Sequence, residues 1–291
     1  FLTDPAARVR IAAAVGLGER KDRAAVPLLL ERLRTEPDLR VFPALLVALG
    51  RIGDPEAVLK LLEFVSHKTS WSRVCAFHAL GELSAPEAAA PARDHLQDPV
   101  WAVRGAAAEC LGEVGVPEDR ERLLPLLSDP EMWPRRGAIY ALGRLGLVDA
   151  APQIRERLAD PDPEVRLAAV WTLGHLEDRE SRDPLLALLA DPLGIPGGPD
   201  TFAQGDGAVM LKSDAKDRIF DTVVQALSRL HQRYADPVIE RALRAARQRL
   251  PTKELHRPAR LPAPETRGGR TPPPLDELFP APTRGSRRVP L

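Results

Sequence analysis

Residues 160–190 read DPDPEVRLAAVWTLGHLEDRESRDPLLALLA, and this stretch decides the fold. It opens on Asp160-Pro161 and reaches Gly174 fourteen positions later. The Asp-Pro pair recurs at 98–99, 129–130, 160–161 and 191–192, and glycine recurs at 50, 81, 112, 143 and 174, both with a period of 31 residues. Repetition at a period of about 20 to 50 residues is typical of solenoids. Successive 31-residue blocks are therefore expected to be copies of one structural unit.

Each block contains the pattern of an amphipathic helix followed by a second, shorter one. Asp160 is predicted to cap the first helix, because its carboxylate can accept the free amides of the first turn. Pro161 suits that turn, where no backbone donor is needed. Apolar and small residues follow at helical spacing. This stripe comprises Val165, Ala168, Ala169, Leu173 and Leu176, and it recurs as 103, 106, 107, 110, 111, 114 and as 41, 44, 45, 48, 49, 52.

The first helix ends in a Leu-Gly-x-Leu pattern. Where a second glycine follows three residues later, at Gly53, Gly115 and Gly146, it is predicted to adopt the left-handed conformation that ends many helices. A second helix follows, as in 183–189. Neither helix can bury its apolar stripe alone, so neighbouring units must stack.

These patterns predict an all-α fold, an α-solenoid (superhelix) of about seven two-helix repeats with an extended C-terminal tail. An insertion at 191–213 separates the sixth repeat from the last helix pair, and residues 251–291 hold ten prolines and are expected to be disordered. The solenoid domain is thus predicted to span 1–250. The repeats are predicted at about 4–35, 36–65, 66–97, 98–128, 129–159 and 160–190, with the last helices at about 214–232 and 235–250.

The charge distribution and the cysteines restrict the function and the compartment. Residues 251–291 hold eight Lys+Arg and four Asp+Glu, which leaves 33 and 37 in residues 1–250. A slightly acidic body argues against nucleic-acid binding. Two cysteines outside any paired spacing are compatible with a reducing, cytoplasmic location, and no apolar run reaches the length of about 18 residues that a membrane helix needs. The abundance of Arg over Lys suggests bacterial coding.

The first residues fit the end of a repeat. FLTDP at 1–5 matches LLSDP at 126–130 and LLADP at 188–192. Phe1 and Leu2 therefore resemble the end of a second helix, and we expect more sequence upstream. The sequence does not indicate an oligomeric state.

Arginines stand eight residues before the periodic glycine and would form a column in stacked repeats. A column of arginines can bind anionic groups, or each can pair with the Asp of a repeat turn. We favour the second interpretation, a structural ladder, because a partly buried Arg needs a carboxylate partner. The residues of the predicted ladder are Asp98, Arg104, Asp129, Arg135, Asp160 and Arg166.

Several aromatic and apolar residues are candidates for partner binding. Trp71, Trp101 and Trp133 lie ten or eleven residues before their glycines and should gather at one edge, as hot spots or as covers over helix ends. Trp171 lies in the middle of its helix and is predicted to be buried. The insertion supplies Phe202 and Met210, and the tail segment PLDELF at 274–279 supplies Leu275, Leu278 and Phe279, which could dock as one helical turn.

No catalytic, cofactor-binding or metal-binding site is predicted. Cys75 and Cys110 fall on the apolar stripe and are interpreted as buried thiols. The six histidines are scattered, and no phosphate-binding glycine loop or Ser-His-Asp pattern is found.

The pattern D-P-x-x-x-V-R-x-A-A-x-x-x-L-G, seen at 160–174 and 98–112, resembles the HEAT family and, within it, the short HEAT-like repeats named after phycobilin lyase subunits. The resemblance covers about 1–250. In that family an Asp/Arg ladder is structural, which supports the same interpretation here. The iron-binding His-Glu dipeptides of the HEAT-like deoxyhypusine hydroxylases are missing.

Three functions are compatible with the sequence. The first is a non-enzymatic scaffold that binds a protein partner on a concave surface lined by the second helices, with exposed residues such as Glu118, Arg120, Arg122, Arg155 and Arg157. The second, implied by the resemblance alone, is a phycobilin lyase-like protein that handles a chromophore. The third is a HEAT-like DNA-binding protein such as an alkylpurine DNA glycosylase, against which the acidic body argues.

Overall fold

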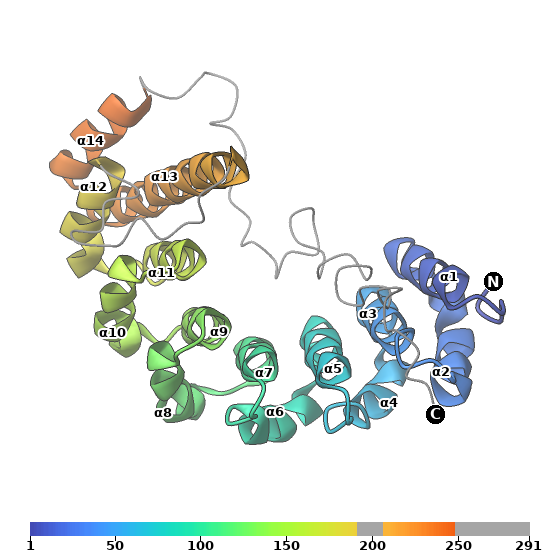
Figure 1. Ribbon diagram of the computed structural model, residues 1–291. Coiled ribbons are helices and arrows are strands. Elements are labelled where there is room, and N and C mark those ends of the chain that lie inside the picture. Colours follow the sequence, from blue (N-terminus) through green and yellow to red (C-terminus); the bar gives the residue numbers. More distant parts are fainter. Residues whose placement is uncertain (191–205, 248–291) are drawn as a thin grey trace, which may run out of the picture. The chain divides into compact units, whose positions relative to one another are not determined.

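The computed structural model describes residues 1–190 and 206–247, which belong to one compact unit, Phe1–Arg247. Every regular element in these residues is helical, as predicted, and the α-helices form seven successive pairs (Figure 1). The α-helices are α1 Ala7–Glu19, α2 Val26–Thr35, α3 Phe42–Ile52, α4 Val58–Leu62, α5 Ser70–Glu82, α6 Ala89–His95, α7 Trp101–Val114, α8 Arg120–Leu123, α9 Met132–Arg144, α10 Ala151–Glu156, α11 Pro163–His175, α12 Arg182–Ala190, α13 Asp206–Tyr234 and α14 Pro237–Arg247.

Short 3₁₀ turns precede or extend the second helix in six of these pairs, so that each repeat reads long helix, tight turn, short helix. No described helix has both the length and the apolar composition needed to span a bilayer. The 3₁₀ turns are Arg23–Ala25, Pro55–Ala57, Pro86–Ala88, Pro117–Asp119, Leu124–Ser128, Val148–Ala150, Arg157–Ala159 and Arg179–Ser181.

The first helices form one continuous row. Each of α1, α3, α5, α7, α9, α11 and α13 packs against the next, whereas the second helices contact one another little and lie mainly against the first helix of the following repeat. Within Phe1–Arg247 the first helices accordingly lie on the inner side of the row and the second helices on its outer side (Figure 1). The expectation that second helices line the concave surface is therefore wrong. The closely spaced helices occupy the shorter side of a curved stack.

The periodic glycine explains why the first helices approach so closely. A Cβ atom added to Gly112 would lie 2.9 Å from the Cα of Ala141 in the next repeat, and one added to Gly50 would lie 2.7 Å from the Cα of Ala79. Such separations are shorter than a carbon–carbon contact allows. At these two positions the glycine is therefore required by contact with the neighbouring repeat.

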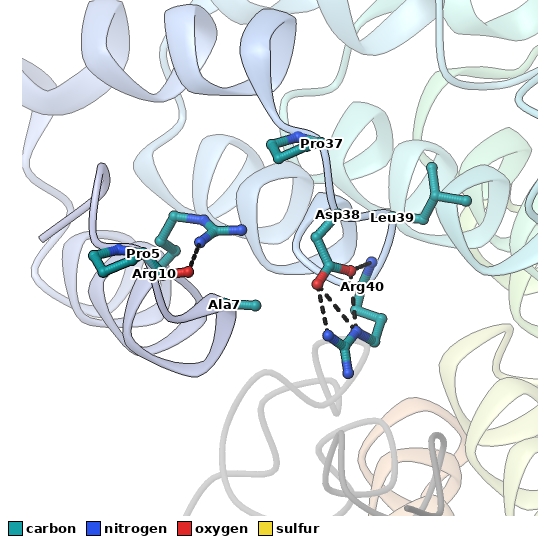
Figure 2. A pocket seen from close by; sticks show the side chains of 7 residues that line it. All are labelled: Pro5, Ala7, Arg10, Pro37, Asp38, Leu39 and Arg40. Atoms are coloured by element: carbon teal, nitrogen blue, oxygen red, sulfur yellow. Dashed lines mark hydrogen bonds and ion pairs between the residues drawn. The ribbon is translucent and has the colours of Figure 1, made fainter. Parts of the chain in front are cut away.

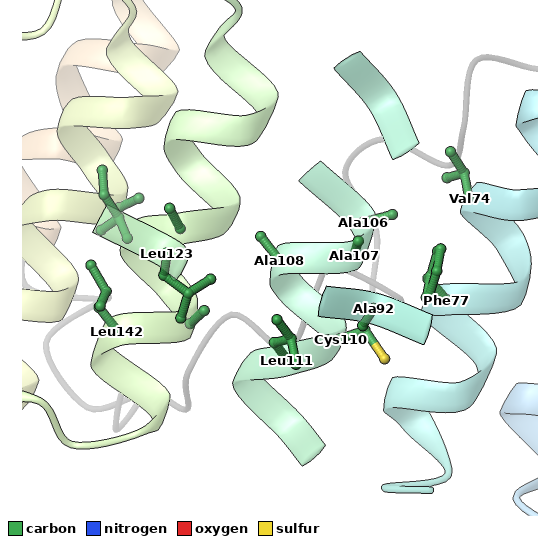
Figure 3. Packing of buried hydrophobic residues seen from close by; sticks show 14 of the residues in the cluster. Val74, Phe77, Ala92, Ala106, Ala107, Ala108, Cys110, Leu111, Leu123 and Leu142 are labelled. Atoms are coloured by element: carbon green, nitrogen blue, oxygen red, sulfur yellow. The ribbon is translucent and has the colours of Figure 1, made fainter. Parts of the chain in front are cut away.

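The predicted apolar stripes form the core between the two rows. Figure 3 shows Phe77, Leu111 and Leu142 pointing into this layer, with small residues such as Ala107 between them. All the predicted stripe positions are buried except Val114, which is partly exposed. Because the layer is continuous, each repeat buries its apolar face only against its neighbours.

The turn before each first helix differs from the prediction. α11 begins at Pro163 with Asp162 as its cap, so Asp160 is not the capping residue. Asp160 Oδ1 instead accepts the backbone N–H of Asp162 at 2.9 Å, and Asp98 accepts that of Val100 at 2.9 Å. This Asx turn leaves the Asp carboxylate free to bind a side chain of the preceding repeat.

The ends of the first helices also vary. Gly53 and Gly146 are left-handed, with φ of 73° and 68°, as predicted, but Gly115 is extended with φ of −77°. α7 ends at Val114, equivalent to Ile52 at the end of α3, yet the chain leaves α7 without a left-handed residue. At the equivalent position Ser84 takes a φ of 49° despite having a side chain.

The last first helix, α13, begins at Asp206 and not near 214. The predicted insertion at 191–213 therefore loses its last eight residues to this helix, in a segment rich in the helix-favouring residues Ala, Met, Leu and Lys. Residues 191–205 lie outside the described residues. The predicted tail at 251–291 does too.

The glycine contacts predict a contrast between two substitutions. Gly112→Ala forces a Cβ to 2.9 Å from Ala141 and should lower the free energy of unfolding by about 1–3 kcal/mol. Gly81→Ala meets Cys110 only at 3.6 Å and should be neutral or stabilise by up to about 1 kcal/mol, since Ala favours the helix. Urea unfolding followed by circular dichroism measures both. Equal losses in the two variants would contradict this role of the glycine.

Candidate functional site

The arginine column forms a ladder between repeats. Arg104 Nε and Nη2 donate to the two carboxylate oxygens of Asp129 in the next repeat at 2.8 and 2.9 Å. Its Nη1 donates to the backbone carbonyl of Asp98 in its own turn at 2.9 Å. Each arginine thus binds two consecutive repeat turns.

The same arrangement recurs along the row. Arg135 binds Asp160 through two hydrogen bonds of 2.8 Å each. Arg166 Nη1 donates to the carbonyl of Asp160 at 2.7 Å, whereas Asp191, its expected carboxylate partner, lies outside the described residues. Since Arg104 and Arg135 use these donors within the fold, the column has little left to offer an anionic ligand. The remaining members of the ladder are Arg73 with Asp98, and Arg10 with Glu36.

Glu36 shows the electrostatic strength of this ladder. Its carboxylate is buried and accepts hydrogen bonds from Arg10 and Arg32. Burial alone would raise the pKa of Glu36, but the hydrogen bonds from the two arginines outweigh it and lower the pKa to about 2. The ionised carboxylate therefore stabilises the fold above its ordinary pKa of 4.5.

The charged residues proposed for the second helices also pair within the fold. Arg120 lies 3.0 Å from Asp149 and Arg155 lies 3.5 Å from Asp178, each in the next repeat. Arg157 donates to the carbonyl of Leu127. These side chains lie on the outer row, together with the exposed Glu118 and Arg122, and three of them join neighbouring repeats.

Two of the three predicted tryptophans come together. The rings of Trp101 and Trp133 stack with centroids 6.1 Å apart and planes inclined by 25°, and 41% of Trp101 is exposed. Trp71 is only half-buried but packs against the core. Met210 lies on α13, in a part whose side chains are not described. Phe202, Leu275, Leu278 and Phe279 lie outside the described residues.

A second group was missed by sequence reasoning. His78, Glu109, Tyr140 and Trp171 stand 31 residues apart, on four successive first helices. Glu109 accepts a hydrogen bond from Arg136 at 2.8 Å and lies 3.6 Å from Nδ1 of His78. The signal was present in the sequence, because the same position is Val15 and Val47 in the first two repeats and becomes polar or aromatic afterwards.

Tyr140 and Trp171 of this column, together with Arg136, His175 and the tryptophan stack, form what we call the aromatic strip. The guanidinium of Arg136 lies 4.3 Å from the ring centre of Trp133 and 5.8 Å from that of Tyr140. The ring of Tyr140 lies 5.8 Å from that of Trp171, which is buried, as predicted, and stacks on His175 at 5.1 Å. The strip thus runs across three repeats, from α7 to α11. Its members are Trp101, Trp133, Arg136, Tyr140, Trp171 and His175.

The electrostatics of the strip suit binding by stacking. Burial raises the pKa of Tyr140 to about 12 and lowers the pKa of His78 and His175 below their ordinary values. The phenol and both imidazoles are therefore neutral at pH 7. Arg136, held by Glu109, supplies the positive charge between the rings.

The other reactive groups are engaged or enclosed. Cys75 and Cys110 are buried, as predicted, and burial raises the pKa of each thiol to about 12. Such thiols are poor nucleophiles at neutral pH. In residues 1–190 and 206–247 no group of three His, Cys, Asp or Glu side chains could hold a metal ion.

A hollow of about 580 Å³ lies between the turns that open the first two repeats. Figure 2 shows Ala7 on one side and Asp38 with Arg40 on the other. Arg40 donates to both carboxylate oxygens of Asp38, and these hydrogen bonds lower the pKa of Asp38. The lining residues are Pro5, Ala7, Arg10, Pro37, Asp38, Leu39 and Arg40.

Comparison with known proteins agrees with this architecture. A family model described as HEAT repeats matches residues 1–74, 72–139 and 121–194. The chain belongs to the HEAT repeat family. These HEAT repeats resemble a solved structure described as the complex of CpcE and CpcF of phycocyanin lyase from Nostoc sp. PCC7120. The TM-score is 0.50 at 20% identity, covering 77% of this chain and 94% of that one.

An engineered protein of known structure is also similar, with a TM-score of 0.38 and 18% identity over 77% of this chain and 94% of that one. No curated protein matches the sequence. At these identities the likeness to solved structures concerns the HEAT fold alone.

The low pKa of Glu36 predicts a pH-dependent contribution to stability. Glu36→Gln should lower the free energy of unfolding by about 3 kcal/mol at pH 7, because it leaves Arg10 without its charged partner. The difference from the wild type should shrink as the pH falls from 4.5 toward 2, as Glu36 itself becomes protonated. Urea unfolding at several pH values measures it.

Glu31→Gln is the matched control, since Glu31 forms an exposed pair with Arg34 and should change stability by about 0–1 kcal/mol. A loss in Glu36→Gln that stays constant down to pH 2 would contradict the assignment.

Proposed function

We propose that this chain is a non-catalytic scaffold that binds a protein partner along the inner row of first helices, over the aromatic strip. The observation that supports this most is the continuity of the strip across three repeats, with Trp101 exposed at one end. Tryptophan, tyrosine and arginine are the side chains that most often dominate protein–protein binding energies.

The surroundings of the strip favour a preformed binding surface. Its side chains stand on packed helices, and Arg136 is held between Trp133, Tyr140 and the carboxylate of Glu109. Side chains positioned in this way lose little conformational entropy when a partner binds. Their neutral and aromatic character suits contact with a protein surface better than the chemistry of a reaction.

The proposal predicts that the exposed tryptophan is a hot spot. Trp101→Ala should weaken capture of the partner from the source cell by at least about tenfold, with little change in thermal stability, because the ring is 41% exposed. Immobilised wild-type and variant chains are compared by quantifying the captured protein over a range of lysate concentrations.

Leu59→Ala is the matched control. Leu59 on the outer helix α4 is 76% exposed, so the substitution removes apolar surface outside the strip. If Trp101→Ala captures as much as the wild type, or if Leu59→Ala weakens capture equally, the strip is not the binding surface.

A second candidate function is the handling of an open-chain tetrapyrrole. It is supported by the likeness to the complex of CpcE and CpcF of phycocyanin lyase. The flat rings of Trp101 and Trp133, with Arg136 beside them, would suit the pyrrole rings and propionates of such a chromophore.

Titration with biliverdin or phycocyanobilin separates the two functions. A chromophore-handling protein should shift the visible absorbance of the bilin, and Arg136→Ala should weaken that shift because it removes a cation from the strip. An unchanged bilin spectrum in the presence of the wild-type chain would eliminate this candidate and leave the scaffold.

A further inference from the structure

The hollow between the first two repeats occupies the position that the tryptophan stack fills between the fourth and fifth repeats. Counted back from the periodic glycine, Ala7 stands eleven residues before Gly18, as Trp101 stands before Gly112. Arg40 stands ten residues before Gly50, as Trp133 stands ten before the glycine at 143. The pair Ala7 and Arg40 is thus the counterpart of the tryptophan stack.

This correspondence explains why the hollow exists. Between the fourth and fifth repeats the rings of Trp101 and Trp133 stack at 6.1 Å in the space between the turns. Between the first and second repeats that space is lined by Ala7 and Arg40, and about 580 Å³ remains open. Pockets that hold small ligands range from about 300 to 1,000 Å³. This hollow has such a volume but is open to solvent, because Pro5, Pro37, Leu39 and Arg40 in its lining are exposed, so it can take a bicyclic ring that stays partly exposed.

The lining suits an aromatic ring in particular. Pro5, Pro37, Ala7 and Leu39 supply apolar walls, and Arg40 supplies a planar cation. The guanidinium of Arg40 is oriented by its hydrogen bonds to Asp38 (Figure 2), and 56% of the Arg40 side chain is exposed. A planar cation beside apolar walls favours the face of an aromatic ring, as Arg136 does against Trp133.

We propose that this hollow is an anchor pocket for an aromatic side chain of a protein partner. The partner's ring would take the place that Trp101 fills in the fourth repeat and would stack on the guanidinium of Arg40. An anchor of this kind is independent of the aromatic strip, because it lies on α1 and on the turn before α3.

N-acetyl-tryptophanamide tests the pocket, because it presents an indole without free charges, as a side chain within a peptide does. Titration of the full chain, followed by ¹⁵N amide shifts, should perturb residues 4–8 and 36–42. The dissociation constant should be about 1 mM, as expected for a ligand of this size. Arg40→Ala should raise it about threefold to tenfold, because the stacking cation is lost.

Ala7→Trp is the decisive variant, because its own indole should fill the hollow and abolish the shifts. Ala12→Trp is its matched control, since Ala12 is exposed on the same helix outside the lining and should leave binding unchanged. Circular dichroism verifies that both variants fold. If Ala7→Trp does not fold, Arg40→Ala tests the proposal instead.

Three outcomes would overturn the proposal. These are no shifts at 10 mM of the probe, unchanged binding in both Ala7→Trp and Arg40→Ala, or binding of free tryptophan but not of the capped amide. The last result would indicate a small-molecule site. None of them depends on capture of a partner by Trp101, so failure of the pocket is distinguishable from failure of the scaffold function.

Discussion

The contact of periodic glycines such as Gly50 and Gly112 with the backbone of the next repeat determines how close these neighbouring first helices can lie. Gly50 against Ala79 and Gly112 against Ala141 bring two helices together with no side chain between them. This closeness places residues 31 positions apart within reach of one another, and both the Arg ladder and the aromatic strip depend on it. It also makes the first helices the inner row, because the second helices are held farther apart.

The ladder uses charged side chains to hold the repeats together, whereas the strip offers aromatic side chains for recognition. Charged groups such as Arg104 and Asp129 are used to hold neighbouring repeats in register, and their best donors and acceptors are paired within the fold. The side chains that remain for recognition are large, flat and neutral, with Arg136 as a held cation between them. Recognition by such a surface is governed by shape and ring contact more than by net charge, in keeping with a chain whose formal charge is zero.

The periodicity of the sequence predicts the helices, their pairing and the buried stripe, because these depend on spacing alone. It predicts the wrong role for Asp160. An Asp before Pro can cap a helix or form an Asx turn, and the pairing of Asp160 with Arg135 of the preceding repeat favours the Asx turn. It assigns the wrong helix row to the concave surface, because curvature follows from the depth of the glycine contacts. The column of His78, Glu109 and Tyr140 was visible in the spacing. The hollow beside Ala7 could be inferred only after the structure showed that Trp101 and Trp133 stack at the equivalent positions.

The ladder also gives the array a direction. Arg10, Arg73, Arg104 and Arg135 each bind an acidic turn of the following repeat, so the two sides of such a repeat are complementary but not alike. Between the second and third repeats the aromatic pair of Phe42 and His67 takes the place of the ion pair. A duplicated copy of a whole 31-residue unit could pair its arginine with the following unit and its acidic turn with the preceding one, so that no charged partner would be left unpaired. An insertion of one or two residues within a first helix would instead displace glycine, arginine and stripe together. Gene duplication in complete units is thus the route by which such a protein can lengthen without losing its fold.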